Sequence, residues 1–218
     1  MLVKDYMVRH PPMGEPGMSI IEAQRYMGEH DIRHLPIVGD GKRLLGLVTR
    51  QTLLVDPGRL GSLDMWEITR YLSRLTVEDV MIKAVDVVTI PPDTPIEEAA
   101  HIMVERRIGC LPVVEDGIVL GLISETDLLQ HLTELMSGRT PCVRVTVHMP
   151  MVRGELAKLV SAIAARGWGI EALGGVVVPK DPYTWEAVIK IAEPKEEVVA
   201  AISAIESQKI VDVRETER

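Results

Sequence analysis

The sequence predicts a mixed α+β/α/β chain: two β-α-β-β-α repeats that form a pseudo-symmetric pair, then a β-α-β-β-α-β unit of ferredoxin-like order. Three observations support this. The segment "RHLPIVGDGKRLLGLVTRQTLL" (33–54) recurs as "GCLPVVEDGIVLGLISETDLL" (109–129). Leu35 and Leu111 are 76 positions apart, a period that indicates a duplicated small domain rather than a solenoid. From residue 143 the pattern changes to an alternating strand, "VRVTVHM".

Each repeat is expected to begin with a short segment and a capped helix. Ser19 stands three residues before Glu22, and Thr94 stands three residues before Glu97, with Pro95 at the first helical position. Two apolar strands around an Asp-Gly turn follow the helix, as "HLPIV" and "LLGLV" in the first repeat. A second helix is expected from "RQTLL" and from "ETDLL".

The third unit has its own order of elements. A strand at 143–149 leads into an amphipathic helix at 154–167, and "ALGGVVV" and "WEAVIKIA" are typical of a hairpin. A last helix opens at Pro194, and "IVDVRE" closes the unit as a strand. The expected boundaries are 1–55 for the first repeat, 56–75 for a linker and helix, 76–135 for the second repeat, 136–141 for a linker and 142–216 for the third unit.

Composition excludes several classes of function. The net charge of −8 argues against nucleic acid as a partner, because phosphate contacts require clustered Lys and Arg. The two cysteines cannot form a disulfide framework, which favours a reducing cytoplasm. No apolar run approaches the ~20 residues that span a membrane, and the N-terminus has no run of signal-peptide length.

The sequence contains no recognisable catalytic motif and no metal-ligand spacing. It lacks G-x-S-x-G, H-E-x-x-H, a P-loop and G-x-G-x-x-G, and its six histidines are scattered. Cys110 is expected to be a small buried strand residue rather than a nucleophile. We therefore expect neither an enzyme nor a metal site.

The duplicated pattern of an apolar-Pro strand, an acidic-Gly turn and G-h-h-[S/T]-x-x-D resembles a tandem pair of CBS domains. The third unit resembles an ACT domain in element order and in "MVRGELAKL", which is similar to the family's turn glycine before its first helix. The domain order CBS–CBS–ACT and the amino-acid sequence of residues 97–138 are similar to those of acetoin-utilization regulatory proteins of the AcuB type.

The resemblance implies that an adenine nucleotide binds between the repeats as a regulatory ligand, without an obligatory cofactor. Ser124 would bind phosphate at a helix N-terminus, and Asp127 would accept both ribose hydroxyls. The first repeat has Thr49 and Thr52 at these places. We therefore expect one competent cleft around Asp127 and a second cleft that is degenerate or takes another ligand.

The resemblance also assigns neighbours to the nucleotide. Residues 8–12 of the first repeat would face Asp127, and Arg107 stands where the family places a phosphate-binding residue. His30 and Asp31 hold the corresponding places in the first repeat, and Asp31 is expected to weaken the first cleft. The residues expected to bind nucleotide are Val8, Arg9, His10, Pro11, Pro12, Arg33, His34, Thr49, Arg107, Ile123, Ser124, Thr126 and Asp127.

Two alternatives stay open at the sequence level. Ser124 and Asp127 also fit a helix cap, with Ser124 as N-cap. An effector site in the ACT-like unit would use Arg153, Gly154, Glu155, Leu156, Gly169 and Ile170. Dimerisation through an edge strand or helix face is an equal alternative there, because the Asp and Asn often found in the family are missing. The predicted function is a cytoplasmic, homodimeric regulatory module with an unidentified target protein; the alternative is a structural protein with empty clefts.

Overall fold

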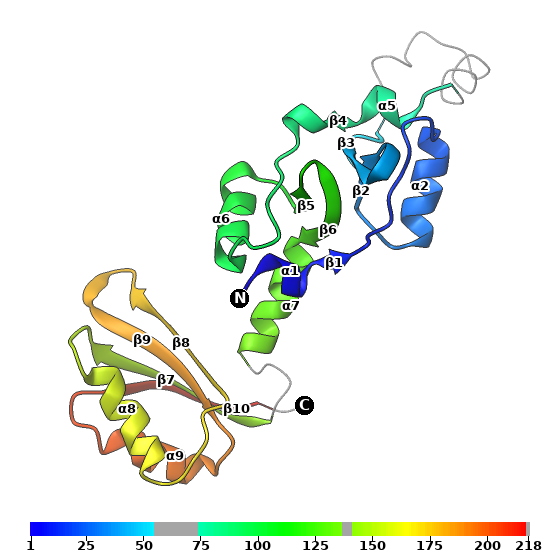
Figure 1. Ribbon diagram of the computed structural model, residues 1–218. Coiled ribbons are helices and arrows are strands. Elements are labelled where there is room, and N and C mark those ends of the chain that lie inside the picture. The colour runs from blue at the N-terminus through cyan, green and yellow to red at the C-terminus, as the bar shows by residue number, and fades with distance from the viewer. Residues whose placement is uncertain (55–73, 137–140, 217–218) are drawn as a thin grey trace. The chain divides into compact units, whose positions relative to one another are not determined.

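The computed structural model describes residues 1–54, 74–136 and 141–216 (Figure 1). Its contacts divide the chain into two compact units, Met1–Leu128 and Leu129–Arg218. The boundary falls inside a helix, before the linker expected at 136–141. The helix expected between the repeats lies almost entirely outside the described residues.

The first unit contains both repeats in the predicted order. The first repeat consists of α1 (Val3–Tyr6), β1 (Val8–Arg9), α2 (Ile20–Glu29), β2 (His34–Val38), the 3₁₀ helix η1 (Asp40–Lys42) and β3 (Leu44–Thr49). The second consists of α5 (Val77–Val80), β4 (Ile82–Lys83), η2 (Ala84–Asp86), α6 (Ile96–Arg106), β5 (Cys110–Glu115), β6 (Ile118–Ser124) and α7 (Glu125–Leu135). The one-turn helices α1 and α5 were not predicted. Residues 51–54, where a second helix was expected in the first repeat, form turns and a bend.

The two repeats exchange their first strands. The sheets have the orders β1-β6-β5 and β2-β3-β4, so β1 of the first repeat joins the second repeat and β4 of the second joins the first (Figure 1). Val8 lies opposite Leu122, and Ile82 lies opposite Leu47. This exchange ties the repeats together and carries the segment after each first strand across the partner repeat.

A glycine makes room for each exchanged strand. A Cβ on Gly121 would lie 2.9 Å from the backbone oxygen of Val8 and would overlap the side chain of Met7. A Cβ on Gly46 would lie 2.6 Å from the backbone oxygen of Ile82. The repeated "LGL" therefore marks the two crossing points.

The helix caps agree with the sequence in one repeat and differ in the other. The backbone N–H of Glu22 donates to Ser19 Oγ at 3.2 Å, which confirms the N-cap of α2. The Thr94 cap is wrong, because Pro95 is the N-cap of α6. The hydroxyl of Thr94 instead donates to the carbonyl of Pro91 at 2.8 Å and closes a turn.

Each repeat has an aliphatic core that includes a residue from the other repeat. The first core contains Ile20, Ala23, Met27, Leu35, Ile37, Val48, Leu53 and Val77. The second contains Val3, Ile90, Ala99, Met103, Leu111, Val113 and Ile123. Val77 and Val3 stand just before the exchanged strands, so core packing stabilises the exchange as well as backbone pairing does.

The second unit has the predicted β-α-β-β-α-β order. It contains β7 (Cys142–Pro150), α8 (Glu155–Ala164), β8 (Ala172–Val178), β9 (Asp181–Ile191), α9 (Lys195–Ser203) and β10 (Lys209–Thr216). The strand order is β10-β7-β9-β8, and each pair is antiparallel. Val145 and Val147 of β7 pack with Leu159 of α8 and Ile202 of α9, so both helices cover one face of the sheet.

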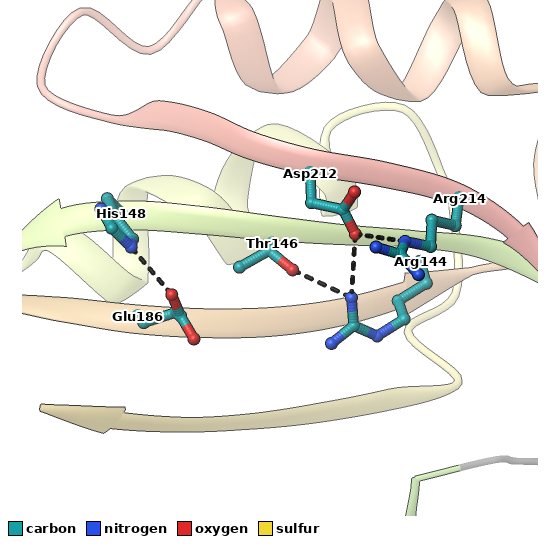
Figure 2. A network of polar contacts seen from close by, with 6 residues as sticks. All are labelled: Arg144, Thr146, His148, Glu186, Asp212 and Arg214. Atoms are coloured by element: carbon teal, nitrogen blue, oxygen red, sulfur yellow. Dashed lines mark hydrogen bonds and ion pairs between the residues drawn. The ribbon is translucent and has the colours of Figure 1, made fainter. Parts of the chain in front are cut away.

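The opposite face of this sheet carries a polar network, as the alternation of β7 predicted. Figure 2 shows its members, which are Arg144, Thr146, His148, Glu186, Asp212 and Arg214. Asp212 accepts from Arg144 Nη1 at 3.3 Å and from Arg214 Nε at 2.9 Å, and His148 Nε2 lies 2.9 Å from Glu186 Oε2. These contacts join neighbouring strands and make a modest contribution to the stability of the sheet.

The described helices are all short. The longest, α6 and α7, have 11 residues each. Among the residues that the structure describes, no helix has both the length and the apolar character required to cross a bilayer.

Candidate functional site

Two clefts lie between the repeats within the first unit. The Asp127 cleft, of about 470 Å³, is lined by Val8, Pro11, Pro12, Asp31, Ile32, Arg33, His34, Arg50, Leu122, Ser124, Thr126 and Asp127. The Thr52 cleft, of about 740 Å³, is lined by Arg33, His34, Leu47, Thr49, Arg50, Gln51, Thr52, Ile82, Asp86, Val87, Val88, Arg107, Ile108, Gly109, Cys110 and Glu125. Both volumes suit a small organic ligand.

The strand exchange explains how each cleft is assembled. The Asp127 cleft combines the junction of β6 and α7 with the loop between α2 and β2 and with the segment after β1. The Thr52 cleft combines the end of β3 with the loop between α6 and β5 and with the segment after β4. Each cleft therefore uses both repeats.

Ser124 and Asp127 form the reciprocal cap at the start of α7. The backbone N–H and the hydroxyl of Ser124 both donate to Asp127 Oδ2, at 2.7 Å each. The backbone N–H of Asp127 donates to Ser124 Oγ at 3.4 Å. The helix-cap interpretation is thus confirmed. The cap does not exclude ligand binding. Its contacts use Oδ2 of Asp127, so Oδ1 of the same carboxylate can accept from another donor.

Thr49 and Thr52 reproduce this turn in the first repeat without a charge. The backbone N–H of Thr49 donates to Thr52 Oγ1 at 3.0 Å, and that of Thr52 donates to Thr49 Oγ1 at 3.1 Å. The Thr52 hydroxyl also donates to the Thr49 carbonyl at 3.0 Å. Its donor is therefore engaged in the turn, and Thr52 supplies no paired acceptor for a ribose.

Two predicted residues lie in the opposite cleft from the one expected. Arg107 was grouped with Asp127 but lines the Thr52 cleft, and Asp31 was assigned to the first cleft but lines the Asp127 cleft. Arg107 follows α6 and Asp31 follows α2, and both are in the left-handed conformation, with φ of 54° and 48°. In each repeat, the loop after this helix faces the cleft that is built on the other repeat. The order of residues in the repeated motif does not reveal this arrangement.

The other predicted residues divide between the cleft wall, the core and the surface. The structure brings together Val8, Pro11, Pro12, Arg33, His34, Ser124, Thr126 and Asp127. Arg9 and His10 are exposed and line neither cleft, since strand alternation turns Arg9 outward, where its Nη2 donates to the carbonyl of Lys4. Ile123 is fully buried in the core of the second repeat, and Thr49 lines the Thr52 cleft.

Sequence reasoning missed three charged residues in the clefts. Arg50 lines both clefts, and Asp86 and Glu125 line the Thr52 cleft. Two of these residues could have been found by aligning the repeats. Arg50 and Glu125 occupy equivalent positions, immediately after "LGLVT" and "LGLIS". A charged residue at this position in both repeats indicates that the side chain there faces a cleft.

Basic side chains form the wall common to the two clefts. Arg33 Nη2 donates to Thr126 Oγ1 at 2.5 Å, across the two repeats. Arg50 lies 3.9 Å from the exposed Asp31, a weak solvent-screened pair. Burial, and then the charge of Arg33, lower the pKa of His34, while Glu125 opposes this effect. His34 is therefore mainly neutral at pH 7, and the positive charge comes from the arginines.

Cys110 lines the Thr52 cleft as a protonated thiol. It is buried, and burial together with the nearby Glu125 charge raises its pKa to about 12. The nucleophilic form is the thiolate, so the structure offers no activation of this side chain.

The candidate effector residues of the second unit surround the start of α8. Gly154 is the N-cap with φ of 92°, and Arg153 and Leu156 are exposed. Gly169 and Ile170 precede β8, and Ile170 packs against the core.

Glu155, in contrast, is buried and engaged within the unit. Its carboxylate accepts from Lys158 Nζ at 2.5 Å and from Ser207 Oγ at 2.6 Å, and its carbonyl accepts from Gln208 Nε2 at 2.7 Å. These contacts join the start of α8 to the loop before β10. They hold the pKa of Glu155 below its usual range, with the Lys158 contact as the largest cause. The structure thus gives Glu155 a stabilising role.

Glu155→Gln is expected to lower the stability of the second unit most at neutral pH. A carboxyl with a lowered pKa stabilises the fold above its unfolded value of about 4.3, and this contribution disappears as the pH falls through the folded pKa. The difference between wild type and variant should therefore shrink between about pH 6 and pH 3. Urea unfolding can be followed by tryptophan fluorescence, since Trp168 and Trp185 pack on this core.

The exposed neighbour Glu206 provides the control for this test. Glu206→Gln should unfold like the wild type at every pH. Equal unfolding of the Glu155 and Glu206 variants at pH 7 would contradict the stabilising role.

Comparisons with known proteins find relatives of the first unit. The CBS domain model matches residues 3–56 and 77–134. Homoserine O-acetyltransferase of Methanohalobium evestigatum is 34% identical over 135 residues, 61% of this chain and 24% of that protein. A solved structure from Vibrio cholerae that bears the name acetoin utilization protein (AcuB) is 31% identical, with a TM-score of 0.52 over 65% of this chain and 98% of that chain. CBSX2, solved in complex with AMP, shares the fold at 23% identity, with a TM-score of 0.51 over 60% of this chain and 95% of that chain.

These matches concern the paired repeats rather than whole relatives. The chain spans less than half the length of the first curated relatives that it matches. The two CBS matches together cover just over half of the 218 residues. The exchanged strands, the two clefts and these matches lead to one conclusion: the chain belongs to the CBS domain family and carries a tandem CBS pair.

Proposed function

We propose that this protein is a non-enzymatic regulatory module that binds an adenine nucleotide in the Asp127 cleft. The observation that carries the proposal is the convergence of Asp127, Ser124 and Arg33 in one cleft between the repeats. A carboxylate, a helix N-terminus and a guanidinium are the groups required for a ribose and a phosphate.

Each part of the nucleotide has a suitable partner in this cleft. Asp127 Oδ1 would accept from the ribose hydroxyls, while Oδ2 keeps the turn closed. The N-terminus of α7 and Arg33 would bind the phosphate. The apolar wall for the base would come from Val8, Pro11, Pro12, Ile32 and Leu122.

Ligand binding would favour one arrangement of the repeats, because the nucleotide contacts both of them. Helix α7 begins at Glu125, and Thr126 and Asp127 of its first turn line the Asp127 cleft. Ligand binding would therefore act directly on the start of this helix.

For the second unit we propose an ACT-type role in homodimerisation or in sensing a small effector. Strand β8 lies at one edge of the sheet and exposes Leu173, Val176 and Val177. An apolar edge without charged residues is suited to pairing with a second copy. A cytoplasmic location and a role in acetoin utilization belong to the same proposal; the latter rests on the name of the Vibrio cholerae relative.

The proposal predicts that the full chain binds an adenine nucleotide with a dissociation constant below about 1 mM. Isothermal titration calorimetry with AMP, ADP, ATP, NAD and S-adenosylmethionine measures this. For the ligand that binds, its 2′-deoxy analogue should bind at least about tenfold more weakly, because one hydroxyl partner of Asp127 is lost. Absence of binding by all five compounds would contradict the proposal and favour a structural role with empty clefts.

A further inference from the structure

Arg33, His34 and Arg50 line both clefts, so the two cavities share one wall. Arg33 is held in this wall by its hydrogen bond to Thr126 of the other repeat. A phosphate group in either cleft would therefore draw on the same two guanidinium groups.

The clefts differ in their remaining charges. Arg107 lines only the Thr52 cleft, which adds a third guanidinium opposed by Asp86 and Glu125. Among the described residues that line the Asp127 cleft there is no third guanidinium, and two carboxylates, Asp31 near Arg50 and Asp127, oppose the two that are present. The balance of charged side chains is thus more positive in the Thr52 cleft.

The Thr52 cleft has no carboxylate at the position equivalent to Asp127. The Thr52 hydroxyl donates to the Thr49 carbonyl within its own turn. Three guanidinium groups, only partly balanced by Asp86 and Glu125, favour a compact polyphosphate anion over a nucleoside.

We propose that the Thr52 cleft binds a small polyphosphate anion, and that this anion lowers the affinity of the Asp127 cleft for its nucleotide. The proposal rests on the nucleotide binding proposed above. Two anions that share Arg33 and Arg50 repel each other, and each receives less of the shared positive charge. The effect is reciprocal, so the nucleotide weakens binding of the anion by the same factor.

Calorimetric titration of the full chain with AMP, at a series of fixed inorganic diphosphate concentrations and constant ionic strength, tests this coupling. The apparent dissociation constant for AMP should rise about fivefold or more and then level off. A plateau indicates two sites, whereas direct competition for one site gives an increase without limit.

Arg107→Asn separates the two sites. Asparagine tolerates the left-handed backbone of this position. The variant should bind AMP like the wild type when diphosphate is absent, because Arg107 does not line the Asp127 cleft. It should require about tenfold more diphosphate to reach the plateau, because one charge-assisted contact is lost.

Three results would overturn the proposal. Failure of diphosphate to bind in its own titration excludes the anion site. An AMP affinity that is unchanged at saturating diphosphate excludes the coupling while leaving the nucleotide site in place. An unlimited increase that is identical in Arg107→Asn shows simple competition in the Asp127 cleft. Failure of AMP and the other nucleotides to bind, with diphosphate still bound, instead contradicts the proposed function.

Discussion

Replacing Asp127 by threonine is expected to weaken adenine-nucleotide binding about a hundredfold while it changes stability little. The first repeat shows why the two effects separate. There Thr52 closes the same turn with its hydroxyl, through hydrogen bonds from and to Thr49. Asp127→Thr should therefore keep a cap on α7 but remove the carboxylate that would accept two ribose hydroxyls.

Asp127→Ala is the comparison that measures how much the cap contributes to stability. It removes both the acceptor for Ser124 and the ribose partner, so it should lose binding and also about 1 kcal/mol of stability. Calorimetric titration gives the binding loss, and thermal unfolding gives the stability. Wild-type affinity in Asp127→Thr would show that Asp127 serves α7 alone and that the nucleotide site lies elsewhere.

The sequence was sufficient to predict features that depend on local pattern. The duplicated motif predicted two repeats, and the change of pattern from residue 143 predicted the separate β-α-β-β-α-β unit. These two predictions succeed because a repeated motif and a period of side-chain burial are visible in a linear string. The replacement of Asp127 by Thr52 predicted one competent and one degenerate cleft. The structure gives the two clefts different linings, and their competence to bind a ligand stays a prediction.

The composition of each cleft could not be predicted in the same way. The residues that line a cleft come from a helix start in one repeat and from a loop in the other repeat. The exchange of β1 and β4 between the repeats decides which loop faces which helix start. Arg107 and Asp31 were consequently assigned to the wrong clefts. The Thr94 cap failed for a related reason, since the local turn at Pro91 competes for the same hydroxyl.

Gly121→Ala is expected to destabilise the first unit by about 2 kcal/mol or more. The added Cβ would lie 2.9 Å from the backbone oxygen of Val8 and would overlap Met7. A backbone atom cannot rotate away as a side chain does, so β1 must move from β6. Differential scanning calorimetry should show a lower melting temperature for the transition of this unit.

Displacement of β1 should also weaken nucleotide binding, because Val8, Pro11 and Pro12 line the Asp127 cleft. Gly46→Ala is the symmetric variant and should destabilise the unit similarly while displacing β4, which lines the Thr52 cleft. Gly28→Ala is the matched control, since its Cβ meets nothing within 4 Å and lies in α2. There the same substitution should stabilise by about 0.5–1 kcal/mol. If Gly121→Ala instead behaves like Gly28→Ala, the exchanged strand does not cross the repeat at this glycine.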